Sequence, residues 1–281
     1  METRHTEPIP VLNENGHPNP GWASHGVLQY DRKAIKASPF RIKEWDWYQV
    51  SDDSKALQFT YGHASYAGQV GVMLFDFEQG KNLYVKDKII PLPFSSMGLN
   101  ASADEDGQLL YDKKDMWMCF EKQGERRTLA CRCENFEAEV TLVRKNPHAL
   151  VINVPFDEKP TAFYYNHKVS CMTALGRVVA NGKEYTFDEN AWGLLDWGRG
   201  VWLFHNEWYW SSASGLLDGV VFGFNLGRGF GHSSAATENC LFYIYGMLKL
   251  CAIDITPGSS YMEPFRLAHR QGLLDVTLTP V

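Results

Sequence analysis

The stretch Phe136-Glu-Ala-Glu-Val-Thr-Leu142 decides the fold class of this chain. Apolar and polar side chains alternate along it, and this period of two is typical of a β-strand with one buried face. The turn residues Arg144-Lys-Asn-Pro-His148 follow and lead into a second apolar run at 149–156. Working outward from this pair, similar signals predict strands at 69–77, 83–90, 178–187, 220–226 and 241–245.

Turn signals separate these strands, and helical patterns are scarce. Asn181-Gly182 marks a tight hairpin within 178–187. Only 31–36 is expected to form a helical turn, because no longer stretch keeps the helical period of about 3.6 residues. Many short strands with frequent turns predict an all-β protein, built as a sandwich or a barrel.

Composition and charge exclude several classes of protein. The chain has 281 residues, of which 44% are hydrophobic and 21% charged, so it can bury a full core. Its net charge is −6 and no basic run exceeds Arg126-Arg127, which argues against a nucleic-acid surface. The N-terminus lacks the apolar segment of a signal peptide, and no apolar stretch approaches the length of a transmembrane helix. We therefore expect a cytoplasmic protein.

The six cysteines show no zinc-ligand spacing. Cys131-Arg-Cys133 is a CxC rather than a CxxC, and no second Cys or His pair accompanies it. We expect buried or half-buried free thiols, no metal site and no cofactor.

Charge density changes along the chain. Charged side chains make up 42 of the first 165 residues but only 18 of the remaining 116. We therefore expect a first β-domain over 22–165 and a second over 166–281. Residues 1–21 contain four prolines and are expected to form an extended arm over the surface.

Tryptophan is the most unevenly distributed residue. Five of the nine tryptophans fall within the 19 residues from Trp192 to Trp210. As a strand, 204–210 would place Phe204, Asn206, Trp208 and Trp210 on one face, and His205, Glu207 and Tyr209 on the other. The first face could stack on a ligand, and the second could act as an acid–base set. The alternative is an ordinary strand with its tryptophans in the core and His205 and Glu207 in water.

Single polar residues in apolar surroundings are further candidates. Asp196 is either an Asx-turn residue beside Gly198 or a buried acid with a raised pKa. Glu238 precedes an apolar strand, as a turn residue or as a pocket carboxylate. His167 is likewise either a core histidine or a ligand-binding one.

Glu44 and Asp46 lie at alternate positions in Lys43-Glu-Trp-Asp-Trp-Tyr48. Some β-sandwich glycosidases place paired carboxylates in this way, in a pattern like ExDxxE. The last position here is Gln49, so the pattern fails where the acid should stand. We expect an ordinary half-exposed strand with Trp45 and Trp47 in the core.

In combination, these motifs resemble the DUF2804 family of uncharacterised proteins over nearly the whole chain. The resemblance is carried by Gly21-Trp-Ala, Arg41-Ile-Lys-Glu-Trp-Asp-Trp-Tyr, Asn166-His-Lys, Gly182-Lys-Glu-Tyr-Thr-Phe, Leu195-Asp-Trp-Gly-Arg-Gly, Trp208-Tyr-Trp, Phe224-Asn-Leu-Gly and Ala236-Thr-Glu-Asn. Members of that family continue beyond the strand expected at Asp275-Val-Thr-Leu-Thr, so the resemblance implies that one or more C-terminal strands are missing from this chain.

More distantly, the second half is similar to lipocalin-like carotenoid hydratases, tocopherol cyclases and fungal Diels–Alderases. The likeness rests on the hairpin after Gly176, on Asp196-Trp-Gly198 and on Trp208-Tyr-Trp210. Those proteins have D-x-x-G, often with a histidine after the aspartate, where this chain has the shorter Asp-Trp-Gly. The likeness implies two lipocalin-like antiparallel β-barrels, or strongly curved sandwiches, packed together around a ligand pocket.

These observations predict a protein that binds a hydrophobic small molecule in an aromatic-lined pocket, with cofactor-free hydration, cyclisation or isomerisation as its chemistry. Asp196 is the expected acid, with His205 or Glu207 as its proton partner. The expected ligand-binding residues are Trp197, Asn206, Trp208, Tyr209, Trp210, Asn225, Glu238 and His167. If it is an enzyme, it is of the lyase or isomerase type.

Two rivals come from other classes. A non-catalytic lipocalin-like carrier would need an apolar pocket but no converging ionisable groups. A carbohydrate-binding β-sandwich would instead display Trp208 and Trp210 as coplanar, solvent-facing platforms.

Overall fold

The protein is built almost entirely of β-strands. The structure is a computed structural model that describes residues 2–93, 95–231, 234–251 and 253–280. Over these ranges it contains no α-helix, only the 3-10 turns η1 (Arg32–Ala34) and η2 (Pro39–Arg41). Asp31 accepts a hydrogen bond from the Lys33 amide and caps η1, so the helical turn expected at 31–36 is confirmed.

One large antiparallel sheet carries most of the chain. Along its main path lie β7 (Lys81–Pro91), β6 (Ala67–Asp76), β5 (Lys55–His63), β4 (Ile42–Ser51), β15 (Trp192–Val201), β13 (Phe163–Ala180), β11 (Phe136–Val143), β10 (Arg126–Cys133), β9 (Met116–Gln123) and β8 (Gly107–Lys113). Two more strands, β12 (Leu150–Pro155) and β14 (Lys183–Phe187), pair with opposite ends of β13. Asn181 and Gly182 have positive φ angles in the turn to β14, as their hairpin signal predicts.

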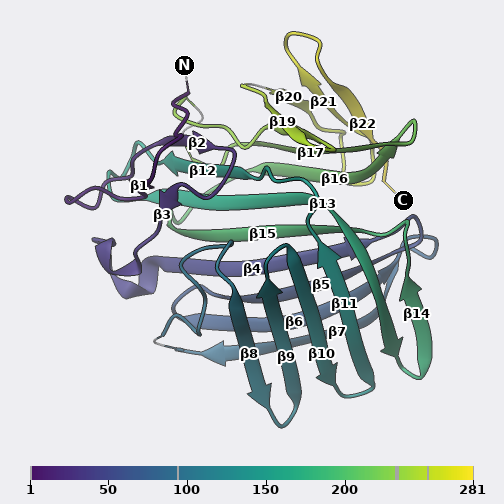
Figure 1. Cartoon of the computed structure of the whole chain (residues 1–281). Helices are drawn as coiled ribbons and strands as arrows, with labels where there is room; N and C mark the ends of the chain where they lie inside the picture. The colour runs from purple at the N-terminus through teal and green to yellow at the C-terminus, as the bar shows by residue number, and fades with distance from the viewer. Residues whose placement is uncertain (1, 94, 232–233, 252, 281) are drawn as a thin grey trace.

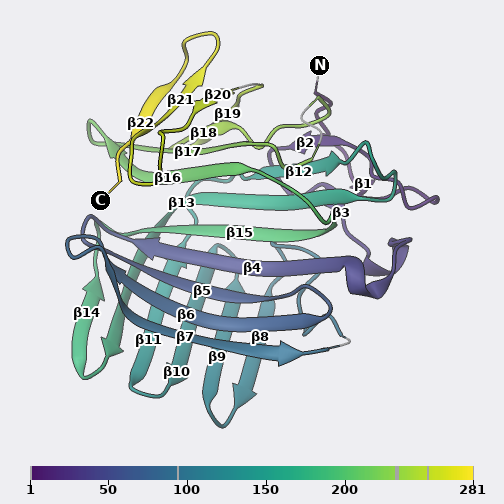
Figure 2. The ribbon, with the colours of Figure 1, turned by 180° about the vertical axis from the view of Figure 1, so that it is seen from behind.

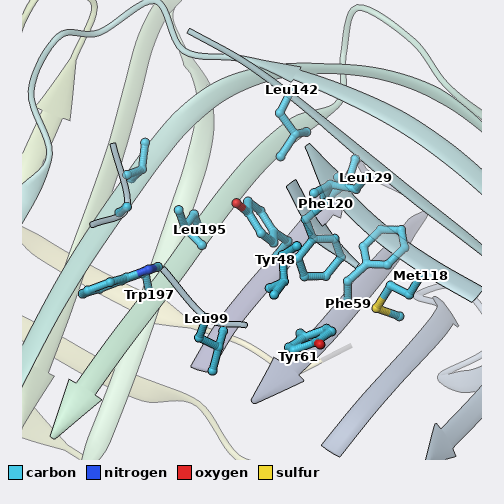
Figure 3. Packing of buried hydrophobic residues seen from close by; sticks show 14 of the residues in the cluster. Tyr48, Phe59, Tyr61, Leu99, Met118, Phe120, Leu129, Leu142, Leu195 and Trp197 are labelled. Atoms are coloured by element: carbon cyan, nitrogen blue, oxygen red, sulfur yellow. The ribbon is translucent and has the colours of Figure 1, made fainter. Parts of the chain in front are cut away.

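This sheet curls on itself, so that β4–β7 face β8–β11 across the main core (Figures 1 and 2). Figure 3 shows Tyr48 and Phe59 on one side packing against Phe120 and Met118 on the other. The Phe120 ring lies edge-on to the rings of Tyr48, at 5.1 Å, and of Phe59, at 5.9 Å. The alternation seen at 136–142 buries Phe136 and its period-two partners in this core. The architecture is all-β and lipocalin-like, as expected.

Strand β13 spans the expected boundary between the two predicted domains. It is 18 residues long and carries a register shift between Val169 and Met172, where Cys171 has a φ of +58°. Such a bulge shifts the alternation of side chains along the strand, so that positions which would have faced one side of the sheet face the other side after it. The expected boundary between residues 165 and 166 falls inside this strand, and strands from both sides of it share one sheet. The division into 22–165 and 166–281 stays a prediction.

Two smaller sheets lie on the side of β13 and β15 that points away from the main core: the first contacts these strands, and the second packs against the first (Figures 1 and 2). The first contains β16 (Tyr209–Leu217), β17 (Val220–Arg228), β18 (Cys240–Tyr243) and β19 (Gly246–Lys249). The second contains β20 (Ile253–Thr256), β21 (Phe265–His269) and β22 (Asp275–Leu278). A second apolar cluster, including Ile152, Tyr164 and Phe242, lies between β12–β13 and the first of these sheets.

The N-terminal segment runs along β12. Its strands are β1 (Ile9–Pro10) and β3 (Leu28–Gln29), which pair with each other, and β2 (Gly21–Ala23), which pairs with β12. The buried Asn153 side chain donates hydrogen bonds to the carbonyls of Val11 and Asn19 and ties this segment down.

Two local expectations are wrong. Residues 204–208 lie outside any strand, and β16 begins only at Tyr209, because this segment bends away from the sheet as one wall of a cavity. On β4, Glu44 and Asp46 face the inside of the curled sheet, whereas Trp45 faces outward. The Glu44 carboxylate is buried and accepts hydrogen bonds from Tyr30 and Arg32, so this strand is not the half-exposed one we expected.

Candidate functional site

A cavity of about 290 Å³ lies between the outer face of β4, β13 and β15 and the segments that cover it. Its aromatic lining comes from Trp45, Tyr164, Trp202, Trp208, Trp210 and Phe230. Its polar lining comes from Lys168, Asp196 and Glu238. We call this space the aromatic cavity. Apolar walls with a few converging polar groups are typical of small-molecule sites.

Lys168 and Asp196 stand opposite each other on neighbouring strands. They are register partners on β13 and β15, and Lys168 Nζ lies 3.0 Å from Asp196 Oδ1. The Asn166 side chain donates a hydrogen bond to the same oxygen, at 2.6 Å. Lys168 is only 1% exposed, so this pair lies out of contact with bulk water.

Glu238 brings a second carboxyl to Lys168 from the segment that precedes β18. Its Oε2 lies 3.8 Å from Lys168 Nζ, and its side chain is 7% exposed. Gly227 makes room for it, because a Cβ there would lie 2.4 Å from the carboxyl carbon. Burial, together with the nearby Asp196, raises the pKa of Glu238 to about 7, although Lys168 and Lys249 oppose the rise. Glu238 is thus a carboxylic acid that can hold its proton near neutral pH.

A chain of hydrogen bonds fixes the wall beside Glu238. The Trp210 indole donates to Asn225 Oδ1 at 2.9 Å, and Asn225 Nδ2 donates to the Glu238 carbonyl at 2.6 Å. The Lys168 ammonium lies 4.6 Å from the Trp210 ring centroid, and the Trp47 ring meets Trp210 edge-on. Asn225 is fully buried behind this wall, so it positions the wall without lining the cavity.

The opposite wall depends on Gly198. The Trp45 ring stacks on Tyr164 with centroids 6.2 Å apart, and Trp202 meets it edge-on. A Cβ at Gly198 would lie 2.1 Å from the Trp45 ring. Residues two apart on a strand share a face, so Asp196 and Gly198 both point toward the cavity. Gly198 leaves space there for the Trp45 indole.

The Gly198→Ala substitution should displace Trp45 and destabilise the protein by about 1–3 kcal/mol, the usual cost of overpacking. Gly215→Ala, in β16, is the matched control, because nothing lies within 4 Å of a Cβ there. Urea unfolding of both variants measures the difference. Equal stabilities would contradict the tight contact between Gly198 and Trp45.

Glu238 should also make stability depend on pH. Its folded pKa, about 7, lies above that of an unfolded glutamate, so the folded state alone keeps the proton between the two values. Glu238 therefore contributes roughly 3 kcal/mol to the free energy of unfolding. This contribution is fully present below the unfolded pKa and is lost as the pH rises through about 7. The fall in unfolding free energy should be correspondingly smaller in Glu238→Gln. The exposed Glu207→Gln should behave like the wild type, and an unchanged Glu238→Gln profile would refute the raised pKa.

The polar trio could transfer protons to a bound apolar molecule. A buried carboxylic acid and a second carboxylate beside one ammonium give two acid–base groups in different environments, as proton-transfer chemistry requires. Among the described residues, no three His, Cys, Asp or Glu side chains are arranged to hold a metal ion. No helix in the described part of the chain is long and apolar enough to span a membrane.

The structure brings together four of the predicted site residues: Asp196, Trp208, Trp210 and Glu238. Asp196 lies within β15 and pairs with Lys168, so the Asx-turn alternative is wrong. His205 and Glu207 are exposed on the segment 202–208 and do not line the cavity with Asp196. Asn206 is bound to the Leu203 carbonyl of the same segment.

Three other predicted residues face elsewhere. Trp197 and His167 lie on the core side of β15 and β13, with ring centroids 5.1 Å apart. Burial lowers the pKa of His167 to about 4, and its Nε2 is hydrogen bonded to the Tyr165 hydroxyl at 2.6 Å. Tyr209 lines a neighbouring apolar groove beside Phe265, which shares Trp208 and Trp210 with the aromatic cavity. The strand period explains these positions, because neighbours of Asp196 and Lys168 point to the opposite face.

Lys168 is the most important residue that sequence reasoning missed. It shares the cavity face of β13 with Tyr164 and Asn166, at alternate positions of an otherwise apolar run. A lysine in such a run is a signal in itself, because lysine is almost never fully buried unless it is paired. The other lining residues that were not predicted are Trp45, which was expected in the core, Tyr164, Trp202 and Phe230.

Two solved structures share this fold. One is a protein provisionally named AttH from Nitrosomonas europaea, with a TM-score of 0.57, 14% identity and coverage of 90% of this chain and 84% of that one. The other is kievitone hydratase from Nectria haematococca, with a TM-score of 0.56, 9% identity and coverage of 84% and 75%. At these identities the likeness concerns the fold alone. No curated protein sequence matches the chain.

The family motifs lie where the structure gives them a physical role. Leu195-Asp-Trp-Gly-Arg-Gly supplies Asp196 and the space for Trp45, and Ala236-Thr-Glu-Asn supplies Glu238. The model of one family, described as "Domain of unknown function (DUF2804)", matches residues 2–281. The chain belongs to the DUF2804 family.

Proposed function

We propose that the protein binds an apolar small molecule in the aromatic cavity and transfers a proton to it from Glu238. The observation that carries the proposal is the position of the Glu238 carboxyl, 3.8 Å from Lys168 in a cavity otherwise walled by aromatic rings. Such walls exclude water and orient an apolar ligand. The enzyme would be of the lyase or isomerase type.

Isomerisation and cyclisation need no further reactant, and hydration needs only water. The Glu238 acid donates its proton to a carbon of a substrate double bond and becomes a carboxylate. The resulting cation lies against the faces of Trp45 and Trp202, where ring quadrupoles stabilise positive charge. Loss of a proton to Glu238 completes an isomerisation or, after ring closure, a cyclisation. Addition of water with return of its proton completes a hydration.

Asp196 has a different part in this scheme from the one the sequence predicted. Its carboxylate is paired with Lys168 and accepts a hydrogen bond from Asn166. We assign it to hold the Lys168 ammonium in place and to keep negative charge beside the cation. Glu238 takes over the role of the acid.

Two arguments favour this proposal over its rivals. A carrier needs no ionisable groups in its pocket, whereas three converge here. The sugar platform needs both Trp208 and Trp210 open to solvent, whereas Trp208 is exposed but Trp210 is half-buried, with its N–H bound to Asn225. One structural neighbour is a hydratase by name, which supports a small-molecule substrate by analogy of fold.

The test is a comparison of wild-type protein with Glu238→Gln on an apolar cell extract, followed by mass spectrometry. The wild type should convert a compound to a product of the same mass or heavier by one water. Glu238→Gln should be slower by about 10²–10⁴-fold, the usual contribution of a general acid. Glu207→Gln should match the wild type. Equal turnover by Glu238→Gln and wild type would refute the acid role, and binding without any turnover would favour a carrier.

A further inference from the structure

A second cavity, of about 250 Å³, shares Glu238 and Phe230 with the aromatic cavity. Its lining is more polar and includes Arg228, Thr237, Asn239, Cys251 and Arg270. Arg228, Cys251 and Arg270 are exposed, so this space reaches solvent at that end. Thr237 and Asn239 are buried close to Glu238. We call this space the polar cavity.

The Glu238 side chain lines both cavities. Oε2 is the oxygen 3.8 Å from Lys168, which lines the aromatic cavity. Oε1 is the oxygen that a Cβ at Gly227 would meet at 2.4 Å, and Gly227 lines only the polar cavity. The carboxyl therefore forms part of the partition between an apolar and a polar space.

We propose that the polar cavity is a water-binding site that supplies Glu238 with water and exchangeable protons. This inference rests on the proposed function and narrows it to hydration or its reverse, dehydration. Glu238 gives its proton to the substrate carbon, and water from the polar cavity adds its oxygen to the cation. The proton released by that water returns to the carboxylate, so one water is consumed and the enzyme is unchanged.

The surroundings suit water better than a second organic ligand. A buried water usually makes two to four hydrogen bonds. Thr237 and Asn239 line the cavity beside Glu238. The Thr237 hydroxyl already donates to the Leu250 carbonyl and Asn239 Oδ1 accepts from the Gly227 amide, so a water would bind to the Glu238 carboxyl and to the amide nitrogen of Asn239. The charged groups near Glu238 are Lys168, Asp196 and Lys249. Lys249 is paired with Glu2 at 2.8 Å, and Arg270, at the exposed end of the cavity, is paired with Asp254 at 2.8 Å, so both cations already have carboxylate partners.

Hydrogen–deuterium exchange at the Glu238 carboxyl tests this route. The carbonyl band of the protonated acid is identified in an infrared difference spectrum between wild type and Glu238→Gln, at mildly acidic pH. Exchange into D₂O is then followed under two conditions. Either the neutral probe phenylnaphthylamine saturates the aromatic cavity, or a bulky maleimide on Cys251 blocks the polar one. Cys251→Ser treated with the same maleimide is the control for labelling at the half-buried Cys133.

The proposal predicts unchanged exchange with the probe and slowing by about tenfold or more with the label, because exchange would then need a local opening. Slowing by the probe and not by the label would overturn it. Fluorescence of the probe reports separately whether the aromatic cavity binds an apolar molecule. Failure of that binding would count against the proposed function, whereas bound probe with label-independent exchange counts only against the water route.

Discussion

Replacing Arg199 by methionine is expected to destabilise the protein by about 3–5 kcal/mol, the cost of leaving a buried charge without its partner. Arg199 is fully buried on the core side of β15. Its guanidinium donates to Asp46 at 3.0 Å and to the carbonyls of Trp45 and Asn100, and it lies 3.8 Å from Glu44. Methionine fills similar volume but leaves the Asp46 carboxylate and these carbonyls without their donor, whereas Glu44 keeps its bonds to Tyr30, Arg32 and His63.

Urea unfolding measures this loss, with Arg177→Met as the matched control. Arg177 lies on the neighbouring strand β13 and makes an exposed ion pair with Glu184 at 2.7 Å. Such pairs contribute about 1 kcal/mol or less. Equal losses in the two variants would contradict the buried network as the support of β4 and β15.

Replacing Trp210 by alanine is expected to weaken binding of phenylnaphthylamine about 30-fold or more, the effect of removing a central aromatic contact. Trp210 lines the aromatic cavity, and its indole also holds Asn225 and so the Glu238 backbone. Its loss therefore removes a contact surface and loosens the acid beside it.

Fluorescence titration gives the Kd of each variant. Trp117→Ala is the control, because Trp117 lies on β9 in the curled sheet and packs under Arg132, outside the aromatic cavity. The control should bind the probe within about twofold of wild type, as surface substitutions away from a site usually do. A Trp210→Ala variant that binds as well as Trp117→Ala would place the probe elsewhere.

The sequence predicts the fold well because strand patterning is local. The alternation at 136–142 and the hairpin at Asn181-Gly182 depend only on neighbouring residues, and both appear in β11 and in the β13–β14 turn. The segment 204–208 misleads for the same reason. Its aromatic residues are spaced as in a strand, but they belong to a wall whose shape is set by distant elements.

The site is less accessible from the sequence because its residues come from five separated segments. Asp196 and Glu238 stand out as acids in apolar runs, and both line the cavity. Lys168 becomes meaningful only once β13 is paired with β15, which places it against Asp196. The raised pKa of Glu238 likewise follows from burial by tertiary packing, which no local pattern reveals.

The central claim is that the aromatic cavity is the ligand site, and a crystal structure with bound bromonaphthalene tests it most directly. The bromine gives an anomalous signal that locates the probe without prior assumptions. We predict a bromine peak between Trp45 and Trp210, beside Lys168 and Glu238. A peak found only in the groove lined by Tyr209 and Phe265, or an empty aromatic cavity at saturating probe, would contradict the account.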